Sequence, residues 1–197
     1  MTENGRSALR AAAFAALLLS TAQAPLRAQE AARREDAGPA AKEETVDAVR
    51  TRAGVLALVR TNPDAEMGLE LRLDGRKVAD VDGALYGSFK AHFRSLDAGE
   101  VVVMLTSDGG SGCPAQFRLI GATEAGKVSL TEEFGDCSDS PDITLRQLPE
   151  EEIRLRFPGY YRLSQLGEPG FRRPPPTTWV YRKGVLRKLK GRGTGGR

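Results

Sequence analysis

The chain has 197 residues, of which 40% are hydrophobic and 28% charged, so it has enough apolar residues for one globular domain and too many for a disordered protein. No apolar run reaches the roughly 18–20 residues of a membrane-spanning helix, and we predict no transmembrane segment in the mature chain. The formal net charge of +3 by itself points to an anionic partner.

Residues 1–28 have the pattern of a secretory signal peptide. Two arginines precede nine consecutive apolar residues, 11–19, which is the order of the charged and hydrophobic regions in such signals. Cleavage is expected after Ala24 or after Ala28, and the second is favoured because the first would leave a proline at the start of the mature chain. The alternatives are an uncleaved anchor and an Ala-rich helix that resembles a signal by chance. We therefore predict a bacterial protein that is periplasmic or secreted.

The rest of the chain divides into three parts by composition. Residues 29–52 are rich in Ala, Glu and Arg and contain no aromatic residue, which predicts a flexible linker with a helical turn or two around residues 43–50. Residues 53–190 carry short apolar and alternating runs, which predict a β domain. Residues 191–197 are expected to form a disordered basic tail.

Several short segments of the β domain have the pattern of strands. In chain order they are residues 55–60, 69–73, 77–81, 85–94, 101–105, 113–121, 127–134, 143–148, 153–157, 177–182 and 185–189. Residues 85–94 also fit a helical stripe, but their period-two alternation extends over the whole segment and favours a strand. The continuously apolar residues 101–105 predict a central strand that is buried on both faces.

Turn signals separate these segments about every 8–12 residues, and Asp74-Gly75 is the strongest of them. No long helix is predicted. We therefore predict an all-β fold, a single antiparallel domain in the form of a barrel, sandwich or curled sheet, with about 9–11 short strands and one disulfide. No regular repeat supports a multi-bladed propeller.

The two cysteines are predicted to form the disulfide Cys113–Cys137, because a pair of cysteines in an oxidising compartment is most simply oxidised. The alternative is a reactive thiol. The sequence has no Cys-x-x-Cys motif, and its one histidine, His92, lies on a separate segment, so nothing in the pattern activates a thiol.

The expected strand register supports this pairing. Residues 123–126 form a hairpin loop between two strand-like runs. If Gly121 pairs near Lys127, the numbers of paired residues add up to about 248, so that Cys113 lies opposite about residue 135. Both sulfurs are then expected at the open end of one hairpin.

Three patterns approach catalytic or metal-binding motifs but do not complete them. Residues 121–127 nearly spell a phosphate-binding loop, yet Val128 follows where the motif needs Ser or Thr. The glycine-rich turn around Ser111 lacks the spacing of a nucleophile elbow. One histidine and two oxidised cysteines cannot supply the three or four ligands of zinc. We predict no catalytic residues, no metal and no cofactor, although an enzyme is not ruled out.

A weaker hypothesis concerns calcium. Asp136, Asp139 and Asp142 are spaced three residues apart around the second cysteine, and Asp108 is expected across the hairpin mouth. Loops with many carboxylate oxygens can bind calcium. The favoured alternative is that these side chains only cap turns.

The C-terminal region is basic, with nine Lys and Arg residues and no acid in residues 172–197. The candidate anion-binding strip consists of Arg182, Lys183, Arg187, Lys188 and Lys190. The favoured alternative is a solvated edge hairpin whose charges prevent edge-to-edge pairing.

Without this region and the signal, residues 29–171 carry 17 basic and 25 acidic residues, a net charge of −8. The sequence thus describes an acidic β body with a basic C-terminal strip, which could equally fold back onto that body.

Residues 112–118 (GCPAQFR) and 134–139 (FGDCSD) resemble uncharacterised exported bacterial β proteins. That group has a glycine-rich turn, Cys-Pro-Ala, an aromatic-Arg strand and a Phe-Gly-x-Cys-Ser segment. The match covers roughly residues 100–145. The resemblance implies a signal peptide and a disulfide-linked β module, and it implies no catalytic residues.

The expected function is that of an exported, disulfide-bonded β module of the bacterial cell envelope that binds or interacts with a partner, and a lysozyme inhibitor is one concrete version. The expected partner is an envelope protein or an anionic envelope polymer, and export argues against nucleic acid. The alternatives are a periplasmic enzyme of unknown class and a structural envelope component held by the basic tail.

Overall fold

A computed structural model describes residues 43–61, 68–96, 99–110, 112–147 and 149–190. These residues form twelve strands and one 3₁₀ helix: β1 (Glu44–Thr51), β2 (Gly54–Arg60), β3 (Leu69–Leu73), β4 (Arg76–Val81), β5 (Tyr86–Leu96), β6 (Gly99–Ser107), β7 (Gln116–Ala122), β8 (Val128–Leu130), β9 (Asp142–Arg146), β10 (Glu152–Phe157), η1 (Leu163–Gly167), β11 (Thr177–Arg182) and β12 (Val185–Leu189). The predicted signal peptide and basic tail lie outside the described residues. No helix in the described residues is long and apolar enough to cross a membrane.

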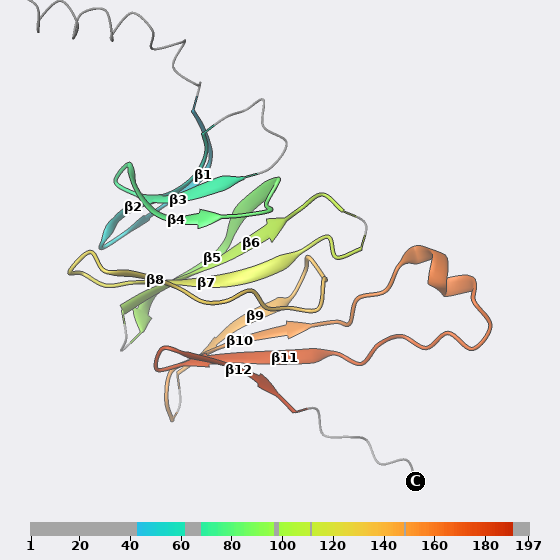
Figure 1. Cartoon of the computed structure of the whole chain (residues 1–197). Coiled ribbons are helices and arrows are strands. Elements are labelled where there is room, and N and C mark those ends of the chain that lie inside the picture. The colour runs from blue at the N-terminus through green and yellow to red at the C-terminus, as the bar shows by residue number, and fades with distance from the viewer. Residues whose placement is uncertain (1–42, 62–67, 97–98, 111, 148, 191–197) are drawn as a thin grey trace, which may run out of the picture. The chain divides into compact units, whose positions relative to one another are not determined.

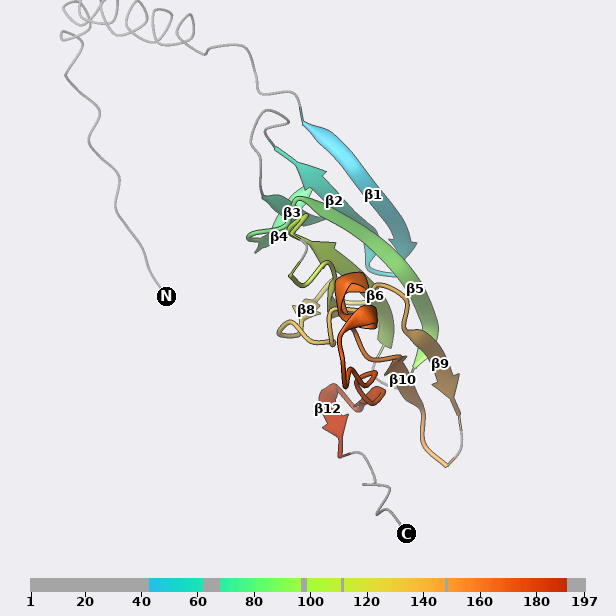
Figure 2. The ribbon, with the colours of Figure 1, turned by 90° about the vertical axis from the view of Figure 1, so that its right-hand side faces the viewer.

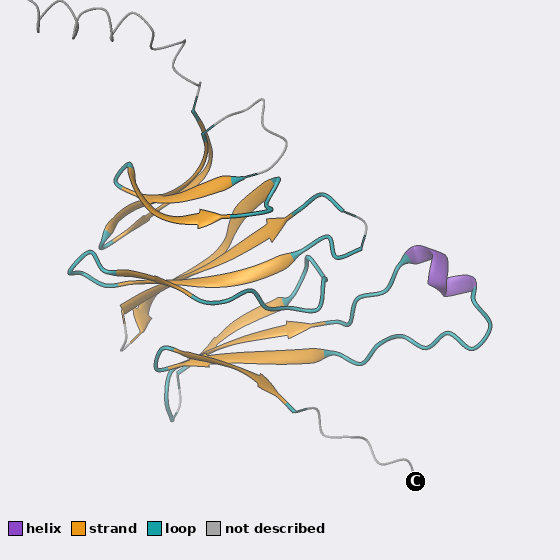
Figure 3. Ribbon diagram, viewed as in Figure 1, coloured by secondary structure: helices purple, strands orange, loops and turns teal. Residues whose placement is uncertain are grey.

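The strands form three antiparallel sheets of four strands each (Figures 1 and 3). Each sheet is a meander whose strands follow chain order: sheet 1 contains β1–β4, sheet 2 contains β5–β8, and sheet 3 contains β9–β12. The predicted antiparallel all-β fold is confirmed, but its form is three sheets and not a single barrel. The same strand order occurs three times although the sequence has no regular repeat, because a meander needs only alternation and short turns.

Sheet 2 is packed on both faces. One apolar cluster joins sheets 1 and 2 and contains Leu58 and Leu71 of sheet 1 and Met104 of sheet 2. A second cluster joins sheets 2 and 3, with Phe117 packed against Phe157. Residues 101–104 of β6 are almost fully buried and contribute alternately to the two clusters, as expected of a central strand.

The strand predicted at residues 85–94 is confirmed as β5, but its faces exchange part-way. A bulge between Phe89 and Ala91 adds one residue to β5, and period-two alternation breaks there. Phe89 therefore packs on the first cluster, whereas Ala91 and Phe93 pack on the second.

The linker prediction is wrong for residues 44–51, which form β1. A bulge in β1 leaves Val46 between the paired residues Thr45 and Asp47. Because of this bulge, Val46 and Val49 both pack on the first cluster although they are three residues apart. Because these two valines are three residues apart, β1 lacks the alternation of apolar and polar residues by which strands are recognised in a sequence.

The first strands of the three sheets, β1, β5 and β9, follow one another along one side (Figure 2). Asp47 links the first two of them, because its Oδ2 accepts a hydrogen bond of 2.7 Å from the backbone N–H of Phe89. Both residues lie at bulges. The bond therefore joins the point where the β1–β2 pairing is interrupted to the point where the β5–β6 pairing is interrupted.

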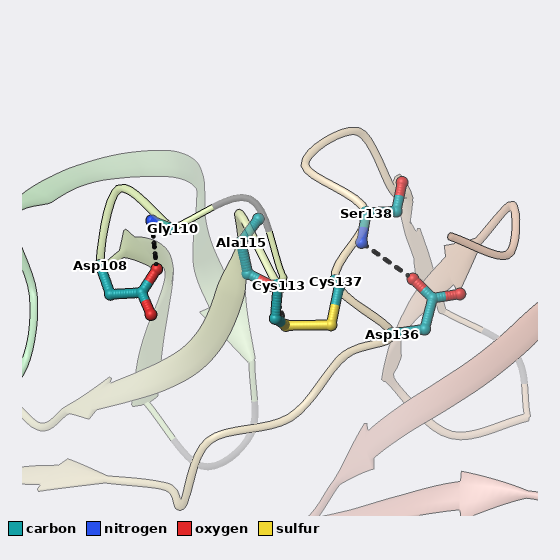
Figure 4. Close-up of a disulfide and its surroundings, with 7 residues drawn as sticks. All are labelled: Asp108, Gly110, Cys113, Ala115, Asp136, Cys137 and Ser138. Atoms are coloured by element: carbon teal, nitrogen blue, oxygen red, sulfur yellow. Dashed lines mark hydrogen bonds between the residues drawn. A yellow bond between two sulfur atoms is a disulfide. The ribbon is translucent and has the colours of Figure 1, made fainter. Parts of the chain in front are cut away.

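The predicted disulfide Cys113–Cys137 is confirmed, with the two Cα atoms 4.6 Å apart (Figure 4). In the β7–β8 hairpin, Gly121 pairs with Ser129, so the numbers of paired residues add up to 250. This register differs by two from the predicted one. The isolated bridge between Phe117 and Phe134 continues the pairing toward the two cysteines, with a sum of 251.

The hairpin signal at Asp74-Gly75 is confirmed, and the turn between β11 and β12 has the same geometry. Asp74 and Gly75 have φ of 47° and 78°, and Lys183 and Gly184 have φ of 50° and 79°. Two successive positive φ values are the geometry of the type I′ turn, which matches the twist of the flanking strands.

Candidate functional site: the arginine face of sheet 3

Sheet 3 alternates between core and solvent along every strand. In β10, Ile153, Leu155 and Phe157 are fully buried, so Arg154 and Arg156 point to the opposite side. The same alternation in β9, β11 and β12 brings further arginines to that side. We define the arginine face as Arg146, Arg154, Arg156, Arg182 and Arg187, with Asp142 and Glu152 as its acidic residues.

An apolar residue lies at the centre of this face. Val180 is the cross-strand partner of both Arg154 and Arg187, and it is only 9% exposed between them. Neighbouring strands are about 4.8 Å apart, so the two arginine Cα atoms are separated by about 10 Å. Two guanidinium groups are thus held on rigid strands on either side of one buried valine.

The acidic side chains neutralise only part of the face. Glu152 is paired with Arg154. Glu150, at the turn before β10, accepts a hydrogen bond of 2.8 Å from Lys183 Nζ and lies 3.0 Å from Arg182 Nη1. The hydrogen bond from Lys183, with the charges of Lys183 and Arg182, lowers the pKa of Glu150.

Three arginines of the face have no acidic side chain within salt-bridge distance in the part of the chain that the structure describes. They are Arg146, Arg156 and Arg187, and all three are exposed. An exposed guanidinium without a carboxylate partner keeps its five N–H donors for water or for a bound anion.

A groove of about 330 Å³ lies on this face. It is lined by the cations Arg154, Arg182, Lys183 and Arg187, by Glu152, and by the apolar residues Val180, Val185 and Leu189. Val185 and Leu189, on the edge strand β12, are 47% and 44% exposed. The groove can therefore bind an anionic group through its arginines and an apolar stem along β12.

The predicted anion-binding strip is divided by the structure. Arg182, Lys183 and Arg187 line the groove, but Lys188 lies on the other side of β12, with its Nζ 5.8 Å from the ring centre of Trp179. Lys190 follows the end of β12 and is exposed.

Arg146, Arg154 and Arg156 were not predicted to belong to the same surface. The alternation of arginine with buried residues in β10 was a usable signal for their common face. What it could not show is that β10 pairs with β11, which brings this face beside Arg182 and Arg187.

The acidic residues of the calcium hypothesis have other roles. Asp108 accepts the N–H of Gly110 at 2.8 Å, and Asp136 accepts the N–H of Ser138 at 3.1 Å (Figure 4). Asp139 accepts the hydroxyl of Ser140, and Asp142 opens β9. Within the described residues, no group of three or more Asp, Glu, His or Cys side chains is arranged to hold a metal ion. The contacts of Asp108 and Asp136 are those of turn capping.

His92 is engaged in a buried polar contact between sheets 1 and 2. Its Nε2 lies 3.0 Å from Oε2 of Glu100, which also accepts the backbone N–H of Arg52 at 3.0 Å. Glu100 is buried on β6 and Arg52 belongs to the β1–β2 turn, so this contact ties the two sheets together. Ser111, the serine of the glycine-rich turn, lies outside the described residues.

No family model, curated protein or solved structure matches this chain.

Proposed function

We propose that this protein is an exported binding module of the bacterial cell envelope and that it captures an anionic polymer on the arginine face of sheet 3. The observation that carries this proposal is the excess of arginine on one rigid sheet. The strands of sheet 3 carry five arginines and two acidic residues on this face, and Glu150 in the preceding turn pairs with Arg182. Three of the five arginines have no acidic partner among the described residues.

The chemistry of arginine supports an anionic ligand. A guanidinium group presents its N–H donors in a fixed fork that matches phosphate and carboxylate groups, and it carries its charge at every physiological pH. Residues 29–171 have a net charge of −8, so most of the body repels a polyanion. A polymer is therefore directed to sheet 3, because attraction is concentrated at one surface.

The compartment supports the same proposal. The pattern of residues 1–28 is that of a secretory signal, and the disulfide Cys113–Cys137 is of the kind that persists in oxidising compartments. A protein exported to the envelope meets polymers that carry phosphate or carboxylate groups at high density.

The experiment measures binding of the disulfide-intact mature chain to linear polyphosphate, with neutral dextran as the uncharged comparison. The test variant is the triple substitution Arg146→Gln, Arg156→Gln and Arg187→Gln, whose members have no acidic partner to leave unpaired. We expect binding to polyphosphate at least about tenfold weaker than wild type, and a slope of log K against log salt smaller by about 2–3.

The matched control is the triple substitution Arg50→Gln, Arg76→Gln and Arg94→Gln. These arginines are also exposed, but they lie on sheets 1 and 2. The control removes the same charge, so it separates a localised site from a general charge effect. Equal losses in the two triple variants would refute a site on sheet 3.

A further inference from the structure

The segment between β10 and β11, residues 158–176, is a second unusual feature of sheet 3. It projects away from the strands and carries η1 near its outer end (Figures 1 and 3). Connections longer than about 12–15 residues are uncommon in compact domains and are usually either functional or linker segments.

The neck of this segment is held by its own side chains. The rings of Tyr161 and Phe171 lie 5.5 Å apart, and the guanidinium of Arg173 lies 5.4 Å from the centre of the Tyr161 ring. At the base, Asp136 accepts the backbone N–H of Gly159 at 3.1 Å. These contacts join the two limbs of the segment.

Two leucines of η1 are left exposed. Leu163 is 83% exposed, more than any other large apolar side chain in the described residues, and Leu166 is 48% exposed. Residues i and i+3 of a 3₁₀ helix lie on the same side, so the two side chains form one apolar tip. Single exposed leucines are common, but a pair at the end of a projecting loop indicates an interaction surface.

The surroundings of this tip are basic. Arg162 precedes η1, Arg172 and Arg173 lie on the returning limb, and all three are exposed. Glu168 is the one acidic residue of the segment. An apolar end backed by cations and by an aromatic ring matches the layers of a membrane interface, where hydrocarbon lies below anionic headgroups.

We propose that Leu163 and Leu166 insert into a lipid surface that contains anionic lipids, and that Arg162, Arg172 and Arg173 contact its headgroups. The segment is then an interfacial anchor that holds the module at a membrane without crossing it. This inference does not depend on the arginine face, which lies on the strands of sheet 3.

The experiment measures co-flotation of the disulfide-intact mature chain with vesicles of phosphatidylcholine, either pure or mixed with phosphatidylglycerol. In the double variant Leu163→Ser and Leu166→Ser we expect partitioning into mixed vesicles to fall by about tenfold for each leucine. Because both leucines are exposed, the variant should keep the thermal stability of the wild type. The matched control is Val78→Ser on sheet 1, where Val78 is 38% exposed, and it should partition like wild type.

Two further arms test insertion and charge. In Leu163→Trp, brominated acyl chains should quench the added fluorescence, whereas the wild type, whose Trp179 lies at the second cluster, gives the baseline. Arg162→Gln with Arg172→Gln should weaken binding to mixed vesicles and leave binding to pure phosphatidylcholine unchanged.

The proposal would be overturned if the leucine double variant partitioned into mixed vesicles as strongly as the wild type. So would unquenched fluorescence in Leu163→Trp. If vesicle binding is absent and an envelope protein is instead captured in a Leu163-dependent manner, the tip is a protein contact and the lipid proposal is wrong. The polyphosphate assay uses no lipid, so failure of either proposal can be told from failure of the other.

Discussion

Removal of the disulfide should destabilise the protein by about 3.5 kcal/mol. Cys113 and Cys137 are separated by 24 positions in the sequence. On the chain-entropy model, closure of such a loop lowers the entropy of the unfolded chain by about 12 cal/mol/K, which is about 3.5 kcal/mol at 25 °C. The perturbation is the double substitution Cys113→Ala and Cys137→Ala, which leaves no free thiol.

The location of the bond suggests that this loss affects two sheets. Cys113 precedes β7 of sheet 2, and Cys137 lies on the connection from sheet 2 to sheet 3. The neighbouring Asp136 accepts hydrogen bonds from Gly159 and Thr177, at the two ends of the segment between β10 and β11. Without the disulfide, this connection should open first as denaturant is added.

The assay is urea denaturation followed by Trp179 fluorescence and by circular dichroism. We expect the midpoint of the double variant to fall and its m-value to rise, because an uncrosslinked unfolded chain exposes more surface. Reduced wild type should match the variant. A destabilisation below about 1 kcal/mol, in the variant and in reduced wild type alike, would refute the reasoning from loop closure.

Two further predictions concern buried polar groups. Glu100→Ala should destabilise the protein by about 2–4 kcal/mol, because it leaves the N–H of Arg52 and the ring of His92 without their buried partner. A double-mutant cycle of Glu100→Ala and His92→Ala measures the interaction between the two side chains. Additive losses of stability in that cycle would contradict a stabilising interaction between them. Burial raises the pKa of Tyr181 above its usual value near 10. The folded state thus favours the neutral phenol, and this contribution is complete below pH 10 and is lost as the pH rises through the folded pKa. Denaturation at pH 9–11 should show wild type losing more stability than Tyr181→Phe, and parallel curves would contradict the assignment.

Local features of this fold could be predicted because they depend on neighbouring residues. The turns at Asp74-Gly75 and Lys183-Gly184 follow from the positive φ that glycine accepts. The disulfide could be predicted because a hairpin register is fixed by its turn, and an error of two positions still brought Cys113 near Cys137.

Other features depended on contacts far along the chain. Alternation shows which side chains share a face but not which sheets stack, so three sheets could not be told from one barrel. Two bulges had different effects on prediction. Val46 broke the alternation of β1 and hid that strand, whereas β5 was predicted as a strand but its extra residue places Phe89 and Ala91 on opposite faces. A bulge is selected by packing between sheets, which no short window of sequence contains.

The arginine face shows the same limit at the site. A strip defined along the chain included Lys188, which lies on the other side of β12, and left out Arg146 and Arg156, which come from earlier strands. Charged residues that are close in the sequence can lie on opposite faces of a strand, because alternate residues point to opposite sides. Charged residues from different strands can share one face when those strands pair.

A comparison of the outward faces of sheets 1 and 3 indicates why solubility alone does not explain these arginines. Neither face is covered by another sheet, so both must be compatible with water. On sheet 1 one group of outward charges is neutralised by pairing: Arg72 Nη2 lies 2.8 Å from carboxylate oxygens of Glu43 and Glu70, and Lys77 lies between Glu70 and Asp80. The bonds to Glu43 and Glu70 raise the pKa of Arg72, so this group of charges is internally satisfied. Arg50 of β1 lies on the same face, is exposed, and has no acidic side chain within salt-bridge distance among the described residues.

Sheet 3 meets the same requirement differently. It keeps arginines without acidic partners among the described residues, beside a groove with exposed Val185 and Leu189. Paired charges of the kind found on sheet 1 would have kept this face soluble without repulsion between like charges. The surplus of positive charge therefore has its simplest explanation in a negatively charged partner, and the two triple variants test that explanation directly.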